Sequence, residues 1–210
     1  MFTLSRIEVS TDGSLSTDSI LHAAGVATNQ NLFALSPADI RARLEANPAV
    51  ASARVSRRLP DTLRIDVAER VAVARLASSF GANAPLAIDA TGHVLGPRSV
   101  RPELPLLVGL RDSALSPGDV SSDPLLPDLM AILDLASAPS LRASYSIQAL
   151  DIRDRSRIRL CLATGQEVLL SLKNYEPKLR QLPVMLSVAR ERGQSLRTFD
   201  MTVDRSYPAR

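Results

Sequence analysis

The chain has 210 residues, of which 45% are hydrophobic and 22% charged, and its formal net charge is +3. These values exclude a disordered or collagen-like protein, and the length allows one large or two modest domains, of which we expect two. Only 3% of the residues are aromatic and acidic residues lie among the basic ones, so nucleic-acid binding is disfavoured.

The residue types that carry catalysis are scarce. Cys161 is the only cysteine, which excludes an internal disulfide and a cysteine metal cage. His22 and His93 are the only histidines and the glycines are scattered, which disfavours a histidine triad, a phosphate-binding loop and a dinucleotide site. No apolar run reaches the roughly 18 residues that a membrane-spanning helix needs. We therefore expect no catalytic residue, no metal site and no cofactor.

The first 70 residues predict the order strand, helix, helix, strand, strand, and hence a sheet with two helices on one face. The expected elements are a strand over residues 3–10, a helix from Ser16 or Thr17 to Gly25, a helix from Ser36 to Asn47, and a hairpin that turns at Leu59-Pro60-Asp61. In the last strand Leu63, Ile65 and Val67 alternate with polar residues, which predicts that they face the core. Residues 71–77 are expected to extend this strand.

The remaining residues predict a β-rich part with helices. The expected elements are a hairpin over residues 86–95, a segment rich in Pro, Ser and Gly over 96–123, a helix over 125–136, a hairpin of strands 158–162 and 168–172, a helix over 177–193 that Pro183 kinks or splits, and a strand over 196–204. In this last strand Phe199, Met201 and Val203 are expected on one face, opposite Thr198, Asp200 and Thr202.

Four arginines alternate along the segment before and within the third hairpin: Arg153, Arg155, Arg157 and Arg159. In an unbroken strand they would line one face and form a binding patch. The favoured interpretation is a solvated hairpin, whose positive charge Asp151 and Asp154 partly neutralise.

The order of elements, together with particular residues, resembles the extracytoplasmic part of the FtsQ/DivIB bacterial cell-division proteins. In the first part the resemblance rests on Ile7-Glu8-Val9, Asp12-Gly13, Ile40, Leu44, Asn47-Pro48, Val50, Arg57, Pro60, Thr62-Leu63, Ile65, Val67 and Glu69-Arg70. Further along it rests on Ile88-Asp89, Gly92, Leu104-Pro105, Gly109, Leu169, Leu179, Leu182 and Phe199-Asp200-Met201.

The resemblance implies an α+β fold in two domains. Residues 1–75 would form a polypeptide-transport-associated (POTRA) domain, a mixed three-stranded sheet with two helices. Residues 76–210 would form a β-rich domain with helices, which a hairpin at about 76–98 links to the first. Val71 stands where the family often has proline. Family members also carry a cytoplasmic tail and a membrane-spanning helix before the POTRA domain, so we expect a membrane anchor upstream of this chain.

The same resemblance implies a function. The protein would be a non-enzymatic scaffold of the divisome on the extracytoplasmic (periplasmic) side of the cytoplasmic membrane, at the division site. It would bind FtsB/FtsL-like proteins and help recruit and regulate septal cell-wall synthesis. The alternative is a POTRA-based docking module of an envelope protein assembly or secretion system. A hydrolase is a third hypothesis, against which the scarcity of histidine and aromatic residues argues.

The candidate partner site is the last strand, because a terminal strand is often at a sheet edge that another chain can complete. The family's late strands form the FtsB site, and the residues here that match or follow are Phe199, Asp200, Met201, Thr202, Val203, Arg205 and Tyr207. Phe199 and Met201 are expected to pack inward, whereas Thr202, Arg205 and Tyr207 are expected to touch the partner. An ordinary closing strand without a partner is the alternative.

Overall fold

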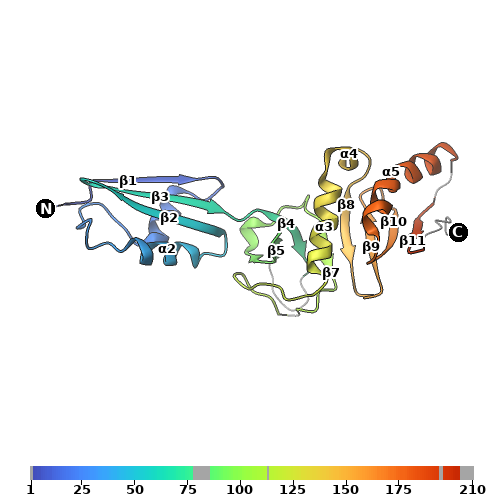
Figure 1. Ribbon diagram of the computed structural model, residues 1–210, viewed down its shortest axis with the longest axis horizontal. Helices are drawn as coiled ribbons and strands as arrows, with labels where there is room; N and C mark the ends of the chain where they lie inside the picture. Colours follow the sequence, from blue (N-terminus) through green and yellow to red (C-terminus); the bar gives the residue numbers. More distant parts are fainter. Residues whose placement is uncertain (1, 78–85, 113, 194–195, 204–210) are drawn as a thin grey trace. The chain divides into compact units, whose positions relative to one another are not determined.

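The chain divides into two compact units, Met1–Val71 (unit 1) and Ala72–Arg210 (unit 2), each with its own hydrophobic core (Figure 1). The structure is a computed structural model, and it describes residues 2–77, 86–112, 114–193 and 196–203. Within these residues, no helix combines the length and the apolar character that crossing a membrane requires.

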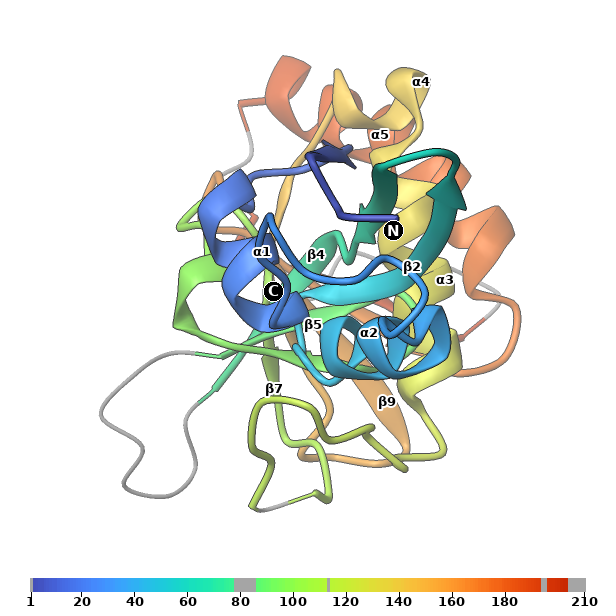
Figure 2. The ribbon, with the colours of Figure 1, turned by 90° about the vertical axis from the view of Figure 1, so that its left-hand side faces the viewer.

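Unit 1 is a three-stranded sheet with two helices (Figures 1 and 2). Its elements are β1 (Arg6–Thr11), α1 (Thr17–Ala24), α2 (Pro37–Glu45), β2 (Val50–Arg58) and β3 (Thr62–Glu69). The strand order is β1-β3-β2, with β1 parallel and β2 antiparallel to β3. The helices contact each other, α1 contacts β1 and α2 contacts β2. This arrangement confirms the mixed three-stranded sheet with two helices.

Local sequence signals explain where these helices begin and end. The Ser16 Oγ accepts a hydrogen bond from the Ser19 amide at 3.2 Å, and the Ser36 Oγ accepts one from the Asp39 amide at 3.3 Å, so each serine satisfies a free donor of the first turn. Gly25 ends α1 in the left-handed conformation, at φ 63°. The core between helices and sheet includes Ile20, Ile40, Leu44, Leu63, Ile65 and Val67, as the alternation predicts.

Unit 2 is built on an eight-stranded sheet with the order β11-β10-β9-β8-β7-β4-β5-β6. Its strands are β4 (Ala72–Leu76), β5 (Leu86–Asp89), β6 (Val94–Leu95), β7 (Leu106–Val108), β8 (Ile147–Asp151), β9 (Arg157–Leu162), β10 (Glu167–Ser171) and β11 (Thr198–Met201). Its helices are the short 3-10 helix η1 (Pro97–Ser99) and the α-helices α3 (Leu126–Ser137), α4 (Pro139–Arg142) and α5 (Tyr175–Glu191). The hairpins β5–β6 and β9–β10 confirm the two that the sequence predicts.

The α-helices and the sheet of unit 2 share one core. Ile158, Leu160 and Leu162 of β9 are buried against it, while Arg157 and Arg159 of the same strand are exposed. This alternation is typical of a sheet that is covered on one face. Leu129 and Ile132 of α3 and Leu179, Leu182 and Leu186 of α5 complete the core.

The sequence interpretation is wrong about the segment after β3. Residues 72–76 do not extend β3 but form β4, which pairs with β5 and β7 in the sheet of unit 2. Val71, the residue between β3 and β4, is 75% exposed, whereas Ala74 and Leu76 are buried in the second core. The expected domain boundary at residue 75 therefore falls inside β4, and the contacts divide the chain after Val71.

Pro183 does not split α5, which begins at Tyr175 and continues to Glu191. A proline inside a helix lacks the amide that would bond to the carbonyl four residues earlier, here that of Leu179. The buried hydroxyl of Tyr145 donates to this carbonyl at 3.5 Å. Burial raises the pKa of Tyr145 to about 12, so the hydroxyl keeps its proton.

Four elements of unit 2 are absent from the sequence interpretation. η1 and β7 lie in the segment rich in Pro, Ser and Gly, and β8 and α4 lie between the predicted helix and the β9–β10 hairpin. β7 is only three residues long and pairs in parallel with β4 and β8, which are distant in sequence. Such a strand is specified by its neighbours more than by its own pattern.

Candidate interaction site at the β11 edge

The sheet of unit 2 has β6 at one end and β11 at the other, and a segment of the same chain covers β6. The Val94 amide donates to the Asp119 carbonyl, and the Gly118 amide donates to the Val94 carbonyl, each at 2.9 Å. The Ser121 amide donates to the Gly92 carbonyl at 2.9 Å. The outward backbone groups of this end are therefore already paired.

β11 lies at the opposite end and pairs in parallel with β10, with Val168 opposite Phe199 and Leu170 opposite Met201. The Glu167 amide donates to the Arg197 carbonyl at 2.7 Å. Because backbone groups alternate between the two sides of a strand, the amides and carbonyls of Phe199 and Met201 face β10.

The same alternation directs the amides and carbonyls of Thr198 and Asp200 away from β10. No strand pairs with this side of β11 within the parts of the chain that the structure describes. The edge therefore offers two donors and two acceptors, which is the pattern that an added strand completes. The sequence interpretation did not include Thr198 among the site residues, although it shares the polar face of the predicted strand with Asp200.

The side chains of β11 separate a core face from an open face. Phe199 and Met201 are 2% and 0% exposed, which is the inward packing expected of them. Thr198 and Asp200, on the other face, are partly exposed. The core face fixes β11 in the sheet, so the edge is presented by an anchored strand.

β11 ends at Met201, earlier than the expected end at residue 204, because Asp200 redirects the chain. The Asp200 Oδ1 accepts hydrogen bonds from the Thr202 amide at 2.9 Å and from the Thr202 hydroxyl at 2.6 Å. The hydroxyl bond and then the amide bond lower the pKa of Asp200, so the carboxylate stays charged. Lys178 of α5, whose ammonium donates to the Thr202 carbonyl at 3.4 Å, is a further contributor that the sequence interpretation missed.

The remaining predicted site residues lie beyond this turn. Val203 does not share the buried face of Phe199 and Met201, as expected from simple alternation, but is 58% exposed, because the strand has already ended. Arg205 and Tyr207 lie outside the described residues. Thr202 is partly exposed, and its amide is taken by Asp200.

The four alternating arginines do not form one stripe, because β8 ends at Asp151 and β9 starts at Arg157. Each arginine has an acidic partner: Arg153 pairs with Asp151, Arg155 with Asp123, Arg157 with Asp154 and Arg159 with Glu167. The favoured interpretation is correct for the pairs with Asp151 and Asp154, whereas the Glu167 partner of Arg159 was not predicted. Arg155 instead reaches a fully buried carboxylate in another segment, which no local pattern could indicate.

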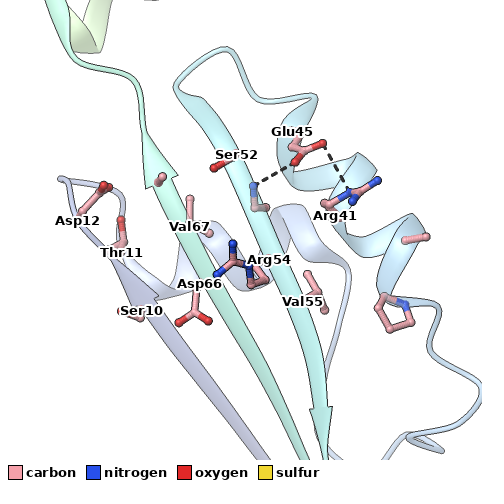
Figure 3. A pocket seen from close by; sticks show the side chains of 14 residues that line it. Ser10, Thr11, Asp12, Arg41, Glu45, Ser52, Arg54, Val55, Asp66 and Val67 are labelled. Carbon is pink, nitrogen blue, oxygen red and sulfur yellow. Dashed lines mark hydrogen bonds and ion pairs between the residues drawn. The ribbon is translucent and has the colours of Figure 1, made fainter.

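In unit 1, β2 is an outer strand of the sheet, and a carboxylate of α2 protects part of its edge. The Glu45 Oε1 accepts the hydrogen bond of the Ala53 amide at 3.1 Å, and its Oε2 lies 3.8 Å from the Arg41 Nε (Figure 3). These residues line a hollow that also includes Arg54 and Asp66. A strand added here would have to displace Glu45.

The two histidines belong to different units of the chain. His22 is exposed on α1 of unit 1, whereas His93 belongs to the β5–β6 turn of unit 2. The Asp89 Oδ1 accepts hydrogen bonds from the amides of Thr91 and His93 and from the Thr91 hydroxyl, which stabilises the turn. Within the described ranges, no three His, Cys, Asp or Glu side chains are grouped closely enough to hold a metal ion.

Comparison with protein families assigns both units. The family described as "POTRA domain, FtsQ-type" matches residues 2–70, and the family described as "Cell division protein FtsQ/DivIB, C-terminal" matches residues 80–202. The two matches correspond closely to units 1 and 2.

Curated relatives are named in the same way. The chain is 29% identical over 187 residues to "Cell division protein FtsQ" of Syntrophotalea carbinolica, which covers 86% of this chain and 64% of the relative. It is 30% identical over 150 residues to the protein of the same name from Geotalea daltonii, which covers 70% of this chain and 51% of the relative. The chain thus spans between about half and two thirds of the lengths of these relatives.

Proposed function

This chain belongs to the FtsQ/DivIB family of cell-division proteins, and we propose that it is a scaffold of the divisome that binds its partner by strand addition at β11. The family supports a role in division. The partner in this proposal is an FtsB/FtsL-like protein, and the complex helps to recruit and regulate septal cell-wall synthesis. The chain would act without catalysis, on the extracytoplasmic side of the membrane.

The open edge of β11 is the observation that carries this proposal. At one end of the large sheet, residues 118–121 of the chain itself pair with the outer side of the β5–β6 hairpin. At the other end, the outward backbone amides and carbonyls of Thr198 and Asp200 in β11 face no described strand. Main-chain hydrogen bonds supply affinity in strand addition, and side chains on either face of the added strand supply specificity. The core-anchored Phe199 and Met201 keep the edge in place before the partner arrives.

The side chains beside the β11 edge also indicate which types of partner residue would fit there. The added strand would alternate between the helix-covered face and the open face of the sheet. On the open face it would lie beside the Asp200 carboxylate, which favours a polar or basic side chain there. Next to the end of β11, the exposed Val203 offers an apolar contact.

The experiment is a titration of the chain, and of the variant Thr198→Pro, against the soluble segment of its FtsB-like partner. Proline removes the outward amide of Thr198 without removing a bond to β10, so we expect affinity to fall about tenfold or more. Thr198→Val is the matched control, because it changes the side chain but keeps the amide. A replacement at Thr202 would be less direct, since its amide is bound to Asp200.

Circular dichroism and thermal melting should show that Thr198→Pro leaves unit 2 folded. If the folded variant binds the partner segment as tightly as the parent, strand addition at β11 is refuted. If Thr198→Val loses affinity to the same degree, the side chain rather than the edge is recognised.

The alternative function, docking through unit 1, has one observation in its favour, the hollow beside β2. Strand addition is the usual way in which an exposed sheet edge captures an extended segment. Glu45 already occupies the Ala53 amide there, so this edge is less available than that of β11. We therefore keep it as the second candidate.

A further inference from the structure

One end of unit 1 exposes large apolar side chains from three segments of the chain. Phe2, Phe33 and Leu59 are 45%, 53% and 62% exposed. We propose that this end, called the tip and made of residues 2–6, 29–35 and 57–62, binds the surface of an anionic lipid bilayer. The inference rests on the proposed function only in placing the chain beside a membrane.

Backbone hydrogen bonds join the three segments into one surface. The Leu32 amide donates to the Phe2 carbonyl at 2.9 Å, and the Ser5 amide donates to the Asp61 carbonyl at 2.9 Å. In Figure 1 the N-terminal end of the chain and the start of β3 lie at the same end of unit 1, opposite the end where β3 leads on to β4. The apolar side chains are therefore presented together, by ordered backbone.

The aromatic side chains of the tip are held in place by each other and by an arginine. The rings of Phe2 and Phe33 pack edge to face with centroids 5.0 Å apart, and the Arg57 guanidinium lies 5.7 Å from the centre of the Phe33 ring. Arg57 also donates to the carbonyls of Leu32 and Leu35, at 3.0 Å and 2.5 Å. Rings positioned in this way lose little conformational entropy when they enter the interfacial region of a bilayer.

The charges of the tip suit anionic headgroups. Its three segments contain Arg6, Arg57 and Arg58 against a single acidic residue, Asp61, and residues 29–35 carry no charge. The Arg58 side chain is 58% exposed and lies 3.9 Å from Glu8, just outside the tip. Arginines beside exposed apolar side chains are the combination with which peripheral segments bind anionic membranes.

A membrane is favoured over another protein because the proposed function places the chain beside one, and because the tip combines an exposed arginine with exposed apolar side chains. A lipid surface also needs no matching groove. It accepts separated apolar points together with neighbouring positive charges, which is what the three segments present. Binding of a second copy of the chain is an outcome that the test below distinguishes.

The chain contains no tryptophan, so a single introduced one is a clean fluorescent probe. We would compare Phe33→Trp with Val184→Trp, which places the probe on the exposed surface of α5, where Val184 is 65% exposed. On addition of vesicles of phosphatidylglycerol and phosphatidylethanolamine, the emission of Phe33→Trp should shift to shorter wavelength. That of Val184→Trp should not change.

Vesicle flotation measures how strongly further variants bind, and each substitution in the tip is compared with a control outside it. Leu59→Ser should weaken binding about tenfold, whereas Val184→Ser should have no effect. Arg58→Gln should weaken binding less, and added salt should weaken the binding of the parent. Arg57 is left unchanged, because it holds the loop carbonyls.

Three results would overturn the inference: no spectral shift of Phe33→Trp at excess vesicles, equal binding to vesicles of phosphatidylcholine alone, or the same shift without vesicles as protein concentration rises. The last would assign the tip to a second copy of the chain. The assay contains no partner protein, so its failure leaves the β11 proposal unaffected. Failure of Thr198→Pro to reduce partner binding would likewise leave the tip unaffected.

Discussion

At the β6 end of the large sheet, residues 118–121 pair with the outer strand, and the Val94 amide and carbonyl are both used. At the β11 end, the backbone amides and carbonyls of Thr198 and Asp200 point away from the sheet, where no described strand lies. One edge strand of this sheet is therefore paired on its outer side, and the other is not paired by any described strand. An edge completed within the chain avoids unwanted pairing, and one left open but anchored is available to a specific partner.

The cover of β6 depends on two carboxylates at the C-terminal end of the covering segment, residues 118–121. Asp112 accepts hydrogen bonds from the hydroxyls of Ser121 and Ser122 and from the Ser122 amide. Asp123 binds the Arg155 guanidinium through both oxygens, each at 2.8 Å. No such internal clamp is visible on the outer side of β11 among the described residues.

The largest effect is expected from removing the anchor of the open edge. Phe199→Ala should reduce the free energy of unfolding of unit 2 by about 3–5 kcal/mol, because the side chain is 2% exposed and its loss leaves a cavity. β11 should separate from β10, and partner binding should be lost with it. Chemical denaturation measures the first effect. An unchanged unfolding midpoint would show that β11 is not held by the core.

A smaller effect is expected from weakening the covered edge. Burial by itself raises the pKa of Asp123, but hydrogen bonds from the Arg155 side chain and the amides of Leu125 and Arg111 outweigh it and lower the pKa to about 2. The resulting stabilisation, about 2 kcal/mol, is present above the ordinary carboxyl pKa near 4 and is lost as the pH falls towards 2. Asp123→Asn should remove it.

Denaturant melts between about pH 5 and pH 2 check this prediction. At about pH 5 the free energy of unfolding of Asp123→Asn should be lower than that of the parent. As the pH falls to about 2, the free energy of unfolding should decrease less in the variant than in the parent. Asp18→Asn, in the first turn of α1, is a control with no expected effect on unit 2. An equally steep decline in parent and variant would show that Asp123 does not hold the cover.

The smallest effect is expected at the partly protected edge of unit 1. Glu45→Ala releases the Ala53 amide to water and should cost less than about 1 kcal/mol. Arg41→Ala is the matched control, since it removes the ion pair but keeps the Glu45–Ala53 bond. Partner affinity at β11 should be the same in both variants. A gain in affinity with Glu45→Ala alone would favour the docking function of unit 1.

The sequence predicts features that depend on local signals. Capping by Ser16 and Ser36 and the alternation of Leu63, Ile65 and Val67 indicate most of unit 1, because each signal acts within a few residues. The β9–β10 hairpin is predicted for the same reason. The inward direction of Phe199 and Met201 follows from a single alternating strand.

Features that depend on distant partners were not predictable. The position of β7 is set by its pairing with β4 and β8. In α5, the carbonyl that Pro183 leaves without an amide donor accepts a hydrogen bond from the distant Tyr145 hydroxyl. The end of β11 was missed for a different reason: the Asp200–Thr202 bond that sets it is local, but strand alternation does not reveal it. Whether an edge is covered is also a tertiary property, and this property separates β6 from β11.

The central claim concerns individual backbone amides, and hydrogen exchange measured by NMR tests it most directly. In the free chain, the amides of Phe199 and Met201 should be protected and those of Thr198 and Asp200 should exchange quickly. On addition of the partner segment, Thr198 and Asp200 should become protected, because an added strand accepts their hydrogen bonds. If the segment binds while both amides continue to exchange at their free rates, the partner does not add a strand at β11.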